Sequence, residues 1–256
     1  MKSNVFDPKR FGLLLRKECR ANHRTLLIVM ALVVAFLLFS ANVYADDPDD
    51  GAAWFNKTWY PVILFLGGFL FTSVSFQEFV GDAQRQFYLN LPASNLEKFA
   101  GKWLITAGVF PIAYTLLYQI LSLLIGAWVK HLYNFEFEIL PLFGAFQRGY
   151  LQLYIVLQSI FLIGAIVFHR YAIVKTSFGL LLIGLALLAS FYGCVRLLFP
   201  EYFDGFEVIN PGPQLKEGFN DWIAGPFWTA LQYAFYLLLW PVMLLIGYFK
   251  LKEKEV

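Results

Sequence analysis

Charged side chains are scarce in this sequence. Only 15% of its 256 residues are Asp, Glu, Lys or Arg, whereas soluble domains carry about 25%. Hydrophobic residues make up 59% of the chain, and its mean hydropathy is +0.60. A soluble fold of this length cannot bury so much apolar surface, so the composition argues against a soluble protein and predicts a polytopic membrane protein.

Residues that form crosslinks and metal sites are also few. The two cysteines, Cys19 and Cys194, fall on opposite sides of the expected membrane, so they cannot pair within one chain. The three histidines, at positions 23, 131 and 169, are scattered over both sides. The sequence therefore predicts neither a structural disulfide nor a metal site.

Sequence motifs of catalysis are missing as well. The chain has no G-x-x-x-x-G-K-[ST] phosphate loop, no G-x-S-x-G and no H-E-x-x-H. We therefore expect no ATP site and no catalytic residue on this chain. The middle of the expected spans holds no ionisable residue that would mark an ion path. An intramembrane enzyme or a secondary transporter stays open, but it lacks its usual marks.

Six apolar runs are long enough to cross the hydrocarbon core of a membrane, which takes about 20 residues. They are continuous, which favours helices over the short alternating strands of a barrel. The expected fold class is therefore an all-α polytopic membrane protein, with six transmembrane helices within residues 25–249. The expected spans are 25–44, 59–78, 103–128, 150–168, 176–199 and 226–249.

The distribution of Lys and Arg predicts the orientation. Fifteen of the 20 lie on the side of the N-terminus, in residues 1–24, 81–102, 169–175 and 250–256. Because positively charged loops stay inside, both termini are expected in the cytoplasm, with the spans in the inner or plasma membrane and a tail at 250–256.

One formal signal near the first loop competes with this view, and a second concerns only glycosylation. Val43 and Ala45 resemble a signal-peptidase site, but the 24-residue basic region and the apolar run are both long for a signal peptide. Asn56-Lys57-Thr58 is a glycosylation sequon, which matters only in a eukaryotic cell.

Residues 1–24 predict an amphipathic helix in the membrane interface. Asp7 and Pro8 form a typical helix start. At about 100° per residue, Leu13 and Glu18 break an otherwise regular pattern. The apolar arc holds Phe11, Leu14, Leu15 and Cys19, and the other arc holds Lys9, Arg10, Arg16, Lys17, Arg20 and Arg24. The basic face would meet lipid head groups or the cytoplasm; the alternative is a plain basic flank of the first span.

Several residues within the spans suggest helix packing. Pro111 and Pro241 should bend the third and sixth spans. Small residues on the fifth span allow close packing with another helix; they are Ala186, Ala189, Ser190 and Gly193. Four glutamines are either polar contacts between helices or the lining of a substrate path; they are Gln119, Gln152, Gln158 and Gln232.

The longest outer loop covers residues 200–225 and carries an apolar face. Leu215, Phe219 and Trp222 share one side of a helical projection. They would rest on the outer leaflet or dip between spans as a cap, and the alternative is an ordinary interfacial belt of aromatic residues.

The most ordered polar segment precedes the third span. Pro92 would end any element that precedes it. Ser94 stands three residues before Glu97, which is the pattern of a capping box. A helix that begins there would continue through Lys98 and Lys102 into the third span. The alternative is a well-capped but passive connection.

The layout and one motif of this chain resemble the permease subunits of ABC-2 type transporters, now grouped with the type V exporters. The similar features are the N-terminal amphipathic helix, six spans and a capped cytoplasmic segment between spans two and three. At the level of motifs, E-x-x-G at Glu78 and Gly81, followed by L-P-A-S-x-x-E-K, is similar to the family's coupling helix. The resemblance implies ATPase coupling through residues 82–98, with the contact made by Glu78, Gly81, Arg85, Leu91, Pro92, Ala93, Ser94, Glu97 and Lys98.

The resemblance also implies partners. It implies two copies of a separate ABC ATPase subunit, which would bind ATP and magnesium, and a second permease chain packed through the first and fifth spans. Membrane lipids are the other expected partners, and no nucleic acid is expected. The transported substrate is not implied, because exporters of many substrates share this layout. The alternatives to this expectation are a non-transporting membrane scaffold or immunity protein, and an intramembrane enzyme.

Overall fold

The structure is a computed structural model that describes residues 6–44, 51–76, 93–133, 140–168, 171–198, 203–204, 207–208 and 225–254. Its helices are α1 (Pro8–Tyr44), α2 (Gly51–Val74), α4 (Asn95–Trp103), the π-helix η2 (Leu104–Val109), α5 (Phe110–Tyr133), α6 (Ala145–Phe168), α7 (Ala172–Leu198) and α9 (Pro226–Lys254). Two short strands, β1 (Phe203–Asp204) and β2 (Glu207–Val208), pair antiparallel.

Most of the chain is helical and apolar, as expected for an all-α membrane protein. Among the described residues, five helices are long and apolar enough to cross a membrane: Phe55–Val74, Asn95–His131, Ala145–Phe168, Ala172–Leu197 and Thr229–Glu253. They coincide with the second to sixth expected spans. The first expected span lies in α1, where the apolar stretch identified is the shorter Met30–Ala41. The strand pair falls within the outer loop and is the only β-structure among the described residues.

Helix α1 differs from the expectation in one respect. It runs without interruption over 37 residues, so the expected amphipathic segment and the expected first span form one continuous helix rather than two with a boundary at residue 24. The reason lies in the sequence, which has no Gly or Pro between residues 13 and 44 to end the helix. The expected start is confirmed: the Lys9 amide donates to Asp7 Oδ1 at 2.9 Å, one residue beyond Pro8.

The third span is likewise continuous with the helix before it, since α4, η2 and α5 follow one another without a gap. A π-helical turn lies directly before Pro111, the proline at which a bend was expected. In this turn the Phe110 amide donates to the Ile105 carbonyl. In this register the next donor, to the Thr106 carbonyl, would be Pro111, which has no N–H. Tyr154 of α6 donates to that carbonyl instead, at 2.8 Å.

An aromatic cluster joins α2, α5 and α6. Tyr114 donates to the Tyr60 carbonyl at 3.0 Å, and Tyr118 donates to Asn56 Oδ1 at 3.1 Å. Asn56 is only 1% exposed, so the first residue of the formal sequon lies inside the bundle, where a glycan has no room. Buried hydroxyl groups need partners, and this network supplies them between helices.

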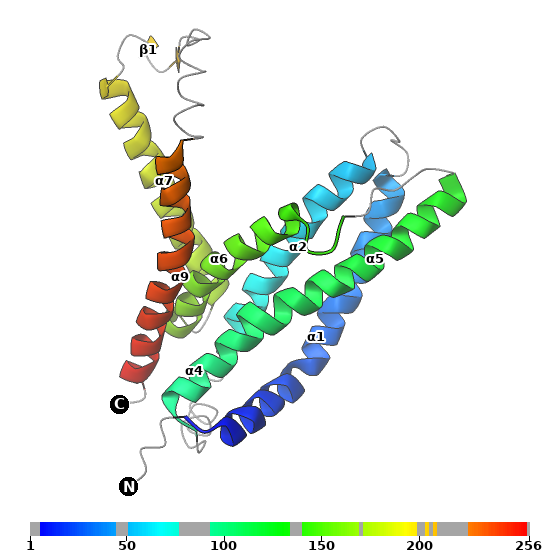
Figure 1. Ribbon diagram of the computed structural model, residues 1–256, viewed down its shortest axis with the longest axis horizontal. Coiled ribbons are helices and arrows are strands. Elements are labelled where there is room, and N and C mark those ends of the chain that lie inside the picture. Colours follow the sequence, from blue (N-terminus) through cyan, green and yellow to red (C-terminus); the bar gives the residue numbers. More distant parts are fainter. Residues whose placement is uncertain are drawn as a thin grey trace.

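The helices form two groups that diverge (Figure 1). Helices α1, α2 and α5 run alongside one another, whereas α7 and α9 lean away on the other side of α6. Helix α6 joins the groups, because it packs against α2, α7 and α9. In the most apolar 18-residue stretch of α7 no residue is buried, so within the described residues α7 presents most of its surface to the surroundings.

Candidate functional site

The capped start of α4 is as expected from the sequence. Ser94 is the N-cap, with extended backbone angles (φ −70°, ψ 156°). The Glu97 amide donates to Ser94 Oγ at 3.2 Å, and the Ser94 amide donates to Glu97 Oε2 at 2.8 Å. Both bonds of a capping box are therefore present, which fixes the direction in which the chain enters the helix.

Glu97 has a second role that the local pattern does not reveal. Its other oxygen, Oε1, accepts from the backbone amide of Asp7 at 2.6 Å and from Arg10 Nη2 at 3.3 Å. The residue is fully buried, at 0% exposure. One carboxylate thus holds the start of α4 and the start of α1 together.

The surroundings of Glu97 favour its charged form. Glu97 lies in the first turn of α4, ahead of the expected span 103–128. Burial raises the pKa of its carboxyl, but hydrogen bonds from the Asp7 and Ser94 amides and the charge of Arg10 outweigh this and bring the pKa below its usual value. The contact is therefore a charge-assisted one at neutral pH.

A second buried ion pair fastens the same two helices. Lys102 Nζ lies 3.3 Å from Glu18 Oε2, and both residues are 3% exposed. Lys102 also donates to the Ser75 carbonyl and lies over the Phe76 ring, 5.3 Å from its centroid. Glu18 broke the amphipathic pattern of the sequence because it faces this lysine across the helix contact.

Apolar packing fills the space around the two pairs. Leu14 is buried, and a Cβ added to Gly101 would lie 3.0 Å from Leu14 Cδ2 and 3.7 Å from Phe11 Cε2. Gly101 therefore lets α1 and α4 approach closely, and Phe11, Leu14 and Leu15 of the expected apolar arc lie on the face of α1 that packs on α4. On its other side, Phe99 belongs to a buried cluster with Leu162 of α6 and Leu251 of α9. We call this meeting point of α1, α4, α6 and α9 the α1–α4 junction.

Some of the expected coupling residues can be placed and others cannot. Ser94 and Glu97 lie at the α1–α4 junction, and Ala93 directly precedes the N-cap Ser94. Lys98, another residue of the expected coupling contact, is only 2% exposed in this chain. Five further residues lie outside the described part of the chain: Glu78, Gly81, Arg85, Leu91 and Pro92. The expected outer cap, Leu215, Phe219 and Trp222, lies outside it too.

The small residues of the fifth span lie on an open helix surface. Ala186, Ala189 and Ser190 are exposed, and Gly193 is partly exposed. A Cβ added to Gly193 would meet no atom within 4 Å. Ser190 Oγ donates to the Ala186 carbonyl of its own helix. No packing within the described residues accounts for these small side chains.

The four glutamines divide into two pairs. Gln158 Nε2 donates to Thr106 Oγ1 at 2.6 Å, and Gln119 Nε2 donates to the Leu140 carbonyl at 2.8 Å, so both hold the bundle together. Gln152 and Gln232 instead line an open groove of about 410 Å³ between α6 and α9. Its other polar and aromatic lining residues are Thr229, Tyr233, Tyr236 and Trp240.

The described residues offer no place for a metal ion, since no three His, Cys, Asp or Glu side chains among them converge. Comparison of the chain with protein families, with curated proteins and with solved structures finds no match in any of the three.

Proposed function

We propose that this chain is the permease subunit of an ATP-driven exporter of the ABC-2 type. It crosses the membrane six times with both termini in the cytoplasm, and α1 supplies the first crossing. A second permease chain and two copies of a separate ATPase, which binds ATP and magnesium, complete the transporter. The segment 82–98 receives the motion of the ATPase and passes it to the spans.

The observation that carries the proposal is the α1–α4 junction. A lever has to be stiff where it receives a force and attached where it delivers it. Helix α4 is capped at its start and continues into the third span without a break. Glu97 and Lys102 attach it to α1, and Phe99 packs it against α6 and α9. A displacement at residue 94 therefore reaches several apolar helices at once.

The groove between α6 and α9 agrees with transport. Gln152 and Gln232 are exposed within the expected spans, and a polar side chain that faces lipid there is costly. A water-lined path or a partner chain beside the groove removes that cost.

The test is co-purification with a phosphate-loop ATPase encoded beside the gene, followed by ATPase assays of the complex in liposomes. Leu91→Asp places a charge in the expected apolar contact. Burying an unpaired charge costs a few kcal/mol, and each 1.4 kcal/mol is a factor of ten in affinity, so binding should fall at least about tenfold.

Leu142→Asp is the matched control, because Leu142 is exposed at the opposite end of the spans. It should leave ATPase binding and turnover unchanged. The proposal fails if no ATPase co-purifies with the wild-type chain, or if Leu91→Asp binds and turns over ATP as the wild type does.

A further inference from the structure

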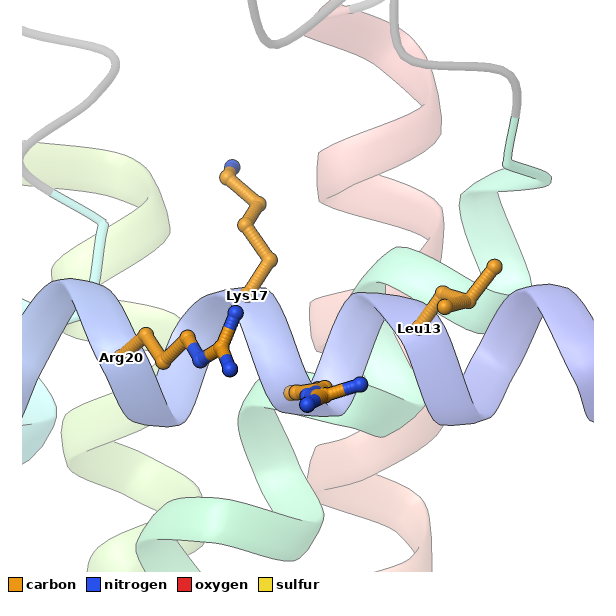
Figure 2. A pocket seen from close by; sticks show the side chains of 4 residues that line it. Leu13, Lys17 and Arg20 are labelled. Carbon is orange, nitrogen blue, oxygen red and sulfur yellow. The ribbon is translucent and has the colours of Figure 1, made fainter.

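The outward face of α1 carries a basic hollow. Leu13, Arg16, Lys17 and Arg20 line a shallow depression of about 560 Å³. Their spacing of three, four and seven residues puts them on one side of the helix. Figure 2 shows Arg20 reaching along the helix toward Lys17, with Leu13 further along the same helix. We call these four residues the α1 basic face.

The α1 basic face points away from the rest of the protein. Leu14 and Glu18, on the other side of the helix, are buried against α4, whereas Leu13 is 66% exposed. Lys17 lies 3.6 Å from Glu18 Oε1, but Glu18 also pairs with Lys102. These five charged groups, Arg16, Lys17, Glu18, Arg20 and Lys102, sum to three positive charges.

The same side of α1 becomes apolar further along. Leu27, Ile28 and Leu32 are all more than 60% exposed, and Leu27 follows Arg20 by seven residues on the same side. At a rise of 1.5 Å per residue, Arg20 and Leu27 are about 10 Å apart along the axis. If Leu27 touches acyl chains, the three cations lie at the level of the lipid head groups.

Leu13 adds a further clue to the ligand. Leu13 stands among the three cations in the lining of the same depression. At about 55 Å, a 37-residue helix is longer than the roughly 30 Å hydrocarbon core. Its first turns therefore have room to lie along the interface, where apolar side chains reach the acyl boundary and cations meet head groups.

We propose that the α1 basic face is a binding site for an anionic phospholipid. Arg16, Lys17 and Arg20 bind its phosphate, and Leu13 contacts the start of its acyl chains. The lipid belongs to the leaflet from which α1 enters the membrane. A guanidinium group binds phosphate through two parallel hydrogen bonds, which suits the two arginines to this role.

The site matters for the molecule because α1 has two faces with two partners. One face is fixed to α4 through Glu97 and Lys102, and the other would be fixed to the membrane surface. A bound lipid would thus hold the α1–α4 junction at a defined depth. This assignment does not depend on the proposed transport function, since it needs only a membrane-embedded chain.

The experiment titrates a fluorescent short-chain phosphatidylglycerol against the purified chain in dodecyl maltoside and follows fluorescence anisotropy. Phosphatidylcholine with the same chains and inorganic phosphate are the competitors. The triple variant Arg16→Gln, Lys17→Gln, Arg20→Gln should bind about a hundredfold more weakly, at about fivefold per cation. Leu13→Ser should weaken lipid binding severalfold.

The matched control neutralises three other lysines of the same side of the membrane, Lys9, Lys250 and Lys252, which are all exposed. It should keep the wild-type affinity. Equal losses in both triple variants would mean that net charge alone acts, and wild-type binding by the Arg16, Lys17, Arg20 variant would remove the site. Displacement of the lipid by millimolar inorganic phosphate, with no effect of Leu13→Ser, would also overturn the proposal, because it identifies a phosphate site without an acyl contact.

Discussion

At the scale of single residues, two buried carboxylates decide how α1 meets α4. Glu97 accepts two hydrogen bonds from amides at two different helix starts, and it also pairs with Arg10. Loss of an N-cap costs about 1 kcal/mol, and each bond to a charged group contributes about 1.5–3 kcal/mol more. Glu97 therefore matters more than Ser94, although the sequence pattern gives them equal weight.

Glu18 and Lys102 allow a sharper prediction. Lys102→Met takes from the buried Glu18 carboxylate the ammonium group that lies 3.3 Å from it, and Glu18→Leu leaves the Lys102 ammonium buried without its carboxylate. Breaking a buried pair in this way costs about 3–5 kcal/mol. The double variant removes both charges, so it should recover more than half of the loss. The midpoint of thermal unfolding in detergent, followed by intrinsic fluorescence, measures all three.

Lys250→Met is the control for this pair. Lys250 and Glu253 also form an ion pair, at 2.7 Å, but both side chains are about half exposed. Such a pair contributes only about 0–1 kcal/mol, so the midpoint should barely move. If the double variant at Glu18 and Lys102 is as unstable as the worse single variant, the two charges do not form the contact described.

At the scale of elements, sequence reasoning succeeded where the interactions are local. The α4 cap joins residues three positions apart, and the α1 start joins residues two positions apart, so both could be predicted from the local sequence. Glu97 meets Asp7 across 90 positions and Lys102 meets Glu18 across 84, which no periodicity can indicate. The same reason hid the π-helical turn, because the partner that permits it, Tyr154, lies on a different helix.

The π-helical turn gives a prediction at this scale. Tyr154→Phe leaves the buried Thr106 carbonyl without its donor, which should cost about 1–3 kcal/mol. Pro111→Ala supplies a backbone N–H that can bond to that carbonyl. In the Pro111→Ala background, Tyr154→Phe should therefore cost less than half as much.

Tyr118→Phe is the matched control, since it also removes one buried hydroxyl that bonds to an oxygen, Asn56 Oδ1. Its cost should be the same in the wild-type and the Pro111→Ala backgrounds. Unfolding midpoints of the variants with and without Pro111→Ala test this. If Tyr154→Phe lowers the stability equally in the two backgrounds, the missing N–H of Pro111 is not the reason that the Thr106 carbonyl bonds to Tyr154.

At the scale of the whole molecule, composition predicted the class of fold and the approximate spans, because long apolar runs in lipid have few alternatives. Composition could not predict that the helices separate into two diverging groups. That division depends on the contacts of α6, whose buried residues face α2 on one side and α9 on the other. The result is an α7 with an open surface (Figure 1).

The open surface of α7 leads to the last prediction, which concerns a pair of permease chains. If α7 packs against a second copy through Ala189 and Gly193, a leucine at either position would separate the two helices. Neither change should disturb the single chain, because Ala189 is exposed and a Cβ at Gly193 meets no atom within 4 Å. A loss of association would then reflect the contact with the second chain and not a disturbed fold of the single chain. Ala113→Leu is the control, since Ala113 is also exposed but lies on α5. The readouts are the mass of the complex in detergent and oxidative crosslinking through the exposed Cys194, in a chain that carries Cys19→Ser. We expect Gly193→Leu to lower the dimer fraction and the crosslinked yield severalfold, while Ala113→Leu leaves both unchanged. A Gly193→Leu chain that dimerises and crosslinks like the wild type would exclude this side of α7 from the contact.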